Sequence, residues 1–124
     1  MQDFRELKVW QKSYQLGLDI HKIPCDFPKE EIYGLTSQMR RSSVSIAANI
    51  AEGCGRKGKA ELIQFLHIAV GSASELEHYI LFSRDLGMLN NTNFERINVN
   101  ISEVKKMLIN LRKKVNNIEK NVKP

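Results

Sequence analysis

The sequence predicts an all-α fold, an antiparallel up-down-up-down four-helix bundle. Three observations predict it: apolar residues recur every three or four positions, glycine and proline fall at only a few places, and no segment sustains the alternation typical of strands. The connections are short, roughly four to six residues, so consecutive helices must pack antiparallel. With 124 residues, 42% of them apolar, the chain fits one domain over residues 1–124.

The first helix is expected over about residues 4–23. It ends before Pro24, because proline cannot continue a helix. Gly17 in its interior predicts close contact with a neighbouring helix. The side expected to pack inward consists of Leu7, Trp10, Tyr14, Leu18 and His21.

The second helix, expected over residues 29–52 and ended by Gly53 and Gly55, has two distinct sides. Its apolar stripe is Leu35, Met39, Ile46 and Ile50, and its polar stripe is Gln38, Arg41, Ser45, Asn49 and Glu52. Serine and asparagine are weak helix formers, so their place in mid-helix favours packing against something. An oligomer or helix interface is therefore expected along the polar stripe, with a solvated face or a ligand site as the alternatives.

The third helix is expected over residues 59–86 and the fourth over residues 93–120. Gly87 stands where the glycine that follows a helix belongs, and Thr92 with Glu95 forms a capping box that starts the fourth helix. The third helix repeats Leu62, Phe65, Leu66, Ala69, Ala73, Leu76 and Ile80. The fourth repeats Ile97, Ile101, Val104, Leu108, Leu111, Val115, Ile118 and Val122, as in a coiled coil.

The positive charge is concentrated in the last helix. Residues 1–102 hold 12 basic and 12 acidic side chains, whereas residues 103–124 hold 7 basic and 2 acidic ones, which accounts for the net charge of +5. A ridge within an arc of about 120° is formed by Lys105, Lys106, Arg112, Lys113, Lys120 and Lys123. No aromatic residue interleaves with it, so it would contact nucleic-acid phosphates rather than bases; the alternative is a solvated face.

The segment Gly53-Cys54-Gly55-Arg56-Lys57-Gly58-Lys59 matches the spacing of a nucleotide phosphate loop. The next residue is Ala60, where magnesium binding needs serine or threonine, and a helix precedes the segment instead of a strand. We therefore expect a loop between helices. A weaker hypothesis is that Arg56, Lys57 and Lys59 hold one phosphate of a nucleic acid beside the free amides of the third helix.

No metal site is expected. Glu75-x-x-His78 has the ligand spacing of di-metal bundles, but such a site needs a second copy of the motif. His21 and His67 have no acid three positions before them. A surface or interface pair is the preferred interpretation of Glu75 and His78.

Neither an enzyme nor a cofactor or small-molecule site is indicated. The serines of Ser42-Ser43-Val44-Ser45 lie within a helix, so no nucleophile has an activating context. Cys25 and Cys54 form no Cys-x-x-Cys pair and are expected to be free thiols. The apolar runs are too short for a membrane span and the start of the chain is not a signal peptide, which predicts a soluble, cytoplasmic protein.

Residues 27–79 carry a set of motifs that resembles one family closely. They are Phe27-Pro28-x-x-Glu31, Gly34-Leu35-x-x-Gln38-x-Arg40-Arg41, Ser45-Ile46, Asn49-Ile50-Ala51-Glu52-Gly53, Gly55-Arg56, Phe65-Leu66-x-x-Ala69 and Gly71-Ser72-Ala73-x-Glu75-Leu76, and the opening Phe4-x-x-Leu7-x-Val9-Trp10 fits as well. The chain thus resembles the four-helix bundle proteins encoded by intervening sequences of 23S ribosomal RNA genes, related to the accessory variability determinant proteins of diversity-generating retroelements.

The resemblance implies a homopentameric barrel that binds nucleic acid or a nucleoprotein, without catalytic residues. Ala47 departs from the proline usual in the family, which should leave the second helix straighter. The expected function is therefore that of a non-enzymatic, oligomeric protein that binds RNA or a ribonucleoprotein through a basic surface. The alternative is a protein–protein interaction scaffold that binds no nucleic acid.

Overall fold

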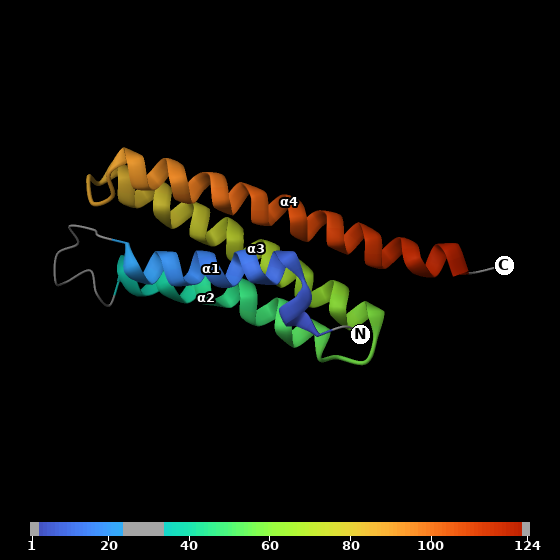
Figure 1. Ribbon diagram of the computed structural model, residues 1–124. Coiled ribbons are helices and arrows are strands. Elements are labelled where there is room, and N and C mark those ends of the chain that lie inside the picture. The colour runs from blue at the N-terminus through green and yellow to red at the C-terminus, as the bar shows by residue number, and fades with distance from the viewer. Residues whose placement is uncertain (1–2, 24–33, 123–124) are drawn as a thin grey trace.

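The computed structural model describes residues 3–23 and 34–122, with side chains up to residue 117. A short 3-10 helix, η1 (Phe4–Glu6), precedes α1 (Lys8–Lys22), α2 (Leu35–Cys54), α3 (Lys59–Asp85) and α4 (Asn91–Val122). Consecutive helices run antiparallel (Figure 1), and the described residues contain no strand. The predicted all-α fold is confirmed.

The helix starts differ from the prediction in two places. Leu7 is extended, with ψ 125°, and separates η1 from α1, so the first segment is not one continuous helix. α4 begins two residues early because Asn90, and not Thr92, caps it: the Asn90 Oδ1 accepts a hydrogen bond from the backbone N–H of Asn93 at 2.8 Å. The predicted start of the second helix lies outside the described residues.

The buried side of α1 also differs from the prediction. Tyr14 is 51% exposed, Leu18 is 37% exposed and His21 is exposed. The buried residues are instead Val9, Ser13, Leu16, Gly17 and Ile20. Gly17 lies so close to α2 that a β-carbon would stand 3.7 Å from the carbonyl oxygen of Ser43. This close approach, which the sequence did predict, buries Ser13 and Gly17 against α2 and leaves Tyr14 and Leu18 outside. Leu7 and Trp10 are half-buried and pack against the core, as predicted.

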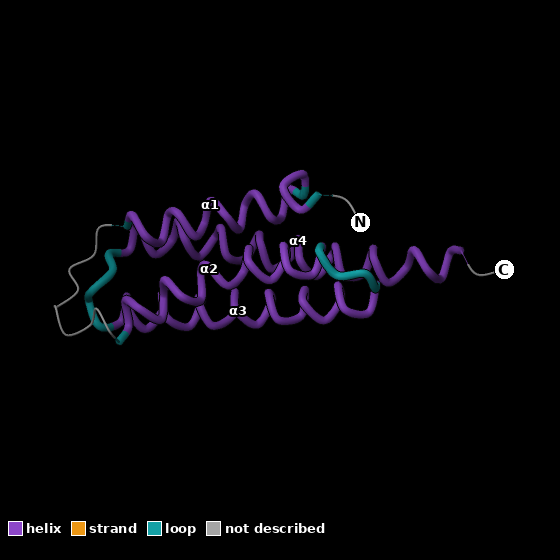
Figure 2. Tube along the Cα trace, turned by 90° about the horizontal axis from the view of Figure 1, so that it is seen from below, coloured by secondary structure: helices purple, strands orange, loops and turns teal. Residues whose placement is uncertain are grey.

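α3 lies at the centre of the packing, against both α2 and α4. Its predicted stripe is buried except for the half-buried Phe65, and the α4 stripe is buried except for the half-buried Leu111. The side chains of Ile118 and Val122 lie outside the described residues. In Figure 2, α4 continues beyond the turn that joins α2 to α3.

Gly87 ends α3 as predicted. Its φ of 77° lies in the left-handed region that glycine adopts without strain. The N–H of Met88 donates to the carbonyl of Ser83 and that of Gly87 to the carbonyl of Arg84, both at 2.9 Å. These two bonds are a Schellman motif, which reverses the chain and leads it into α4.

Gly53 and Gly71 should respond to alanine in opposite ways. A β-carbon on Gly53 would lie 2.9 Å from the Cβ of Phe65, whereas one on Gly71 would meet nothing within 4 Å. We expect Gly71→Ala to stabilise the fold by up to about 1 kcal/mol through helix propensity. Gly53→Ala should destabilise it by a net 1 kcal/mol or so, because overpacking outweighs that gain. Urea unfolding of both variants measures the difference; equal shifts would contradict the close packing at Gly53.

Candidate nucleic-acid interface

The two basic segments predicted from sequence converge at one end of the bundle. A hollow of about 530 Å³ is lined by the loop residues Gly53 to Lys59, by Leu62 of α3 and by Val115 of α4. The α2–α3 turn and the carboxyl-terminal half of α4 lie at this same end (Figure 1). The loop and the carboxyl-terminal half of α4 thus lie at the same end of the bundle, which we call the basic end, and the hollow itself is lined by cations of the loop and not by any described lysine of α4.

The cations of α4 are not equivalent. Lys105 donates to the carboxylate of Glu77 at 3.2 Å, so its charge is already paired. Arg112 lies 3.0 Å from Nδ1 of His67. An arginine is always protonated and can only donate, so His67 accepts this bond through an unprotonated nitrogen. Both pairs tie α4 to α3 and hold these side chains against the bundle.

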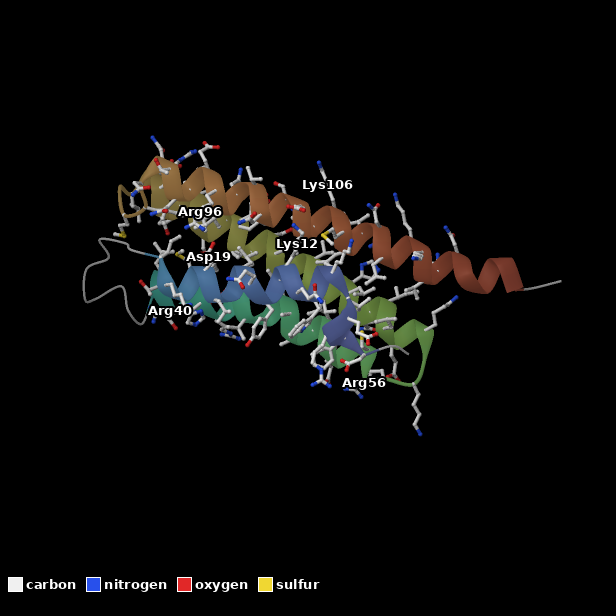
Figure 3. The ribbon with its side chains drawn as sticks, in the orientation of Figure 1. Lys12, Asp19, Arg40, Arg56, Arg96 and Lys106 are labelled. Carbon is white, nitrogen blue, oxygen red and sulfur yellow. The ribbon has the colours of Figure 1, made fainter. Side chains whose placement is uncertain are left out.

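In the α2–α3 loop and the described part of α4, the exposed lysines with no acidic partner among the described residues are Lys57, Lys106, Lys113 and Lys114. Figure 3 shows Lys106 pointing away from the bundle. Lys114 was absent from the predicted ridge, because its angular position around the helix lies outside the arc of the other basic residues. Because its side chain is exposed next to Lys113, we add Lys114 to the candidate phosphate contacts. Lys120 lies in α4 and Lys123 beyond it, and both side chains are outside the described part of the chain.

In the α2–α3 loop, Arg56 is held by other side chains of the protein, whereas Lys57 is exposed to solvent. Arg56 donates to Glu52 at 2.7 Å and its guanidinium lies 5.1 Å from the centre of the Phe65 ring. Lys57 is exposed at the tip, and Lys59 is the first residue of α3. α3 has no side-chain cap at its first turn, which leaves a positive helix end beside these cations.

The polar stripe of α2 is partly an interface within the protomer. The hydroxyls of Ser45 and Ser72 lie 2.9 Å apart, and Asn49 Nδ2 donates to the Ser45 carbonyl at 2.8 Å. These residues therefore face α3, as the helix-interface interpretation predicted. Gln38 is half-buried and Arg41 is exposed. A subunit interface along the stripe stays a prediction.

Cys54 forms part of the wall of the hollow at the basic end. The thiol is half-buried, and burial raises its pKa above the ordinary value. A raised pKa means less thiolate near neutral pH and hence low reactivity. Cys25, the other predicted free thiol, lies outside the described residues.

No cluster of three or more His, Cys, Asp or Glu side chains suited to a metal ion occurs in residues 3–23 and 34–117. Glu75 and His78 are both exposed on α3, where His78 borders a shallow hollow with Phe94. None of the described helices is both long and apolar enough to cross a membrane.

Comparisons with known proteins give one family and one closely similar fold. The family model of the 23S rRNA-intervening sequence protein matches residues 5–110. A crystal structure of a protein with unknown function from the S23 ribosomal protein family of Bacteroides thetaiotaomicron is similar over 85% of this chain and 95% of that one. The two share 28% sequence identity, with a TM-score of 0.78. No curated protein matches.

The contact between Ser45 and Ser72 should appear as an energetic coupling. Each serine is changed to alanine, alone and together, and the free energy of unfolding is measured for all four proteins. We expect a coupling of about 1 kcal/mol, the value of one part-buried hydrogen bond. Additive effects would show that Ser45 does not bond to α3.

Cys54 should react slowly with an alkylating reagent in a Cys25→Ser background. Because burial raises its pKa, the rate at pH 8 should fall well below that of the urea-unfolded chain. It should still be rising above about pH 8.5, where an ordinary thiol begins to level off. Equal rates in the folded and unfolded chains would contradict the burial of this side chain.

Proposed function

Because the chain belongs to the family of 23S rRNA-intervening sequence proteins, we propose that it is a non-enzymatic, oligomeric protein that binds RNA, free or within a ribonucleoprotein. The observation that supports this proposal is that the α2–α3 loop and the carboxyl-terminal half of α4, which both carry exposed lysines, lie at the same end of the bundle. The family's name links it to ribosomal RNA genes, and the charge supplies a physical means of contact with RNA.

The contact is made to the phosphate backbone. Lys106 and Lys113 lie two helical turns apart, about 11 Å along α4, so they reach different phosphates. Lys57 and Lys114 widen the surface across the end of the bundle. No aromatic side chain stands among these four lysines in α4 or at the loop tip, so bases are not stacked there. The surface distinguishes RNA by shape and charge more than by sequence.

A homo-oligomer, with a pentamer as the expected form, multiplies this surface. Several copies of a weak basic end contact one RNA at once, and each further contact is intramolecular. The exposed Arg41 and half-buried Gln38 are the residues of the polar stripe that remain for a subunit contact. We also propose that the protein is cytoplasmic, since ribosomal RNA is found there. The proposal includes its kinship with the accessory variability determinant proteins.

The alternative function is a protein-binding scaffold whose lysines only keep it soluble. Salt dependence separates the two functions. Neutralising phosphates releases counterions, so RNA affinity falls steeply with salt, whereas an apolar protein contact changes little.

Charge reversal at the basic end should weaken RNA binding selectively. The variant Lys57→Glu, Lys106→Glu, Lys113→Glu is titrated with a structured RNA over a salt series. We expect the slope of log affinity against log salt to become shallower by about two to three, since each lost phosphate contact removes about 0.7 to 0.9.

The control reverses exposed cations at the opposite end of the bundle, as Lys22→Glu, Arg40→Glu, and leaves Arg41 of the proposed subunit contact unchanged. It should retain most of the affinity and the slope of the native protein. Light scattering confirms that each variant keeps the native oligomeric mass. Equal losses in both variants, or no binding by the native protein at low salt, would leave the scaffold function as the better account.

A further inference from the structure

An apolar groove follows the seam between α1 and α2, on a different face from the basic end. Its volume is about 280 Å³. Its lining consists of Ser13, Tyr14, Gly17, Leu18, His21, Ser43, Val44 and Ala47. The floor is formed where Gly17 meets the backbone of Ser43, so small residues make the bottom and larger ones the rims.

The rims expose apolar surface that the protomer does not cover. Tyr14 and Val44 are each 51% exposed and Leu18 is 37% exposed. The Tyr14 ring stacks on Trp10 with centroids 4.8 Å apart, and Trp10 meets Phe4 edge to face at 5.0 Å. This aromatic row is already ordered, so a partner that packs on it immobilises few further side chains.

Among the described residues, the unpaired charges beside the groove are positive. Lys22, Arg40 and Arg41 form no ion pair with any described residue. The acid of α1, Asp19, is paired with Arg96 of α4, and Glu52 of α2 is paired with Arg56 at the other end of the helix. In Figure 3, Asp19 lies toward Arg96 while Arg40 lies on the opposite edge of the bundle. An acidic partner therefore meets no unpaired carboxylate among the described residues of α1 and α2 beside the groove.

The Ser13 hydroxyl is the second independent feature of this groove. Ser13 is 0% exposed, lines the groove, and its Oγ has no hydrogen-bond partner. By contrast, the buried serines of α2, Ser42 and Ser43, each donate to a backbone carbonyl of their own helix. A polar side chain inserted into the groove would supply the partner that Ser13 lacks.

We propose that the α1–α2 groove binds an amphipathic helix of a partner protein, with acidic residues beside its apolar face. The apolar anchors, spaced i, i+3 or i+4 and i+7, pack between Tyr14, Leu18 and Val44. The acidic residues lie toward Lys22, Arg40 and Arg41, where they gain charge complementarity. Such a helix adds a fifth member to the bundle by the same ridge-into-groove packing that holds the other four. This interaction does not depend on RNA binding.

The test is a selection of helical peptides of about 18 residues, long enough to follow the groove, displayed in a random library and bound to the full-length protein. We expect the enriched peptides to combine apolar residues at helical spacing with Asp or Glu on one flank. The best synthetic peptide is then titrated by fluorescence anisotropy. Its affinity should fall about tenfold or more in the Leu18→Ser, Val44→Ser variant. It should fall about fivefold in the Arg40→Glu, Arg41→Glu variant.

The matched controls alter the same residue types elsewhere. Val99→Ser removes an exposed apolar side chain of α4, and Lys106→Glu reverses an exposed lysine. Both should leave peptide affinity unchanged, and circular dichroism confirms that every variant is folded. Three results would overturn the proposal: no enriched acidic peptide, equal binding to the groove variants, or competition by RNA. A lower oligomeric mass in the Leu18→Ser, Val44→Ser variant would also overturn it, because a second copy would then cover the groove.

Discussion

The close pairing of α2 with α3 is the contact on which the rest of the structure depends. At its base, Gly53 lets α2 approach Phe65 and Leu62 more closely than any larger residue permits. Higher up, Ser45 and Ser72 form a hydrogen bond across the same seam. Small residues on both helices bring the backbones together, which increases dispersion contacts and excludes water from the pair. α1 and α4 then pack on the two sides of this pair.

The position of the basic end follows from that pairing. In an antiparallel bundle with short connections, the end of α2, the start of α3 and the end of α4 must lie together. Lys57 and Lys113 lie at the same end of the bundle for this reason alone.

Sequence periodicity predicted the buried faces of α3 and α4, but only part of the buried face of α1. The α3 and α4 stripes are apolar throughout, so only one face can be buried. In α1 the apolar spacing correctly predicted that Leu7 and Trp10 pack against the core. It was wrong for Tyr14 and Leu18, since hydrophobicity ignores how closely two backbones approach. The start of α4 failed for a related reason: Asn90 and Thr92 are both good caps, and only the geometry of the turn after Gly87 selects between them.

The basic surface was predictable as a set of residues but not as a set of available charges. Sequence identifies Lys105 as basic, yet its ion-pair partner Glu77 comes from another helix. Arg112 is likewise held by His67 of another helix but keeps its charge, because a histidine that accepts a hydrogen bond carries no negative charge. Pairing between helices depends on register, which a single sequence does not give. It follows that counting basic residues overestimates the charge that a ligand meets, and that the unpaired lysines carry more of the potential than their number suggests.

Some positions of α1 are occupied in a way that does not stabilise the isolated protomer. A protomer selected for stability alone would bury Tyr14 and Leu18 and expose Ser13 and Gly17, because apolar burial yields about 25 cal/mol per Å². α1 buries Val9, Leu16 and Ile20 in the core, but at these four positions it does the reverse: it buries an unpaired hydroxyl and exposes an aromatic and an aliphatic side chain. That exchange lowers the stability of the isolated bundle. Its benefit must therefore lie in contacts that the isolated protomer does not make, and the outward face of α1 with α2 is where those contacts are to be sought.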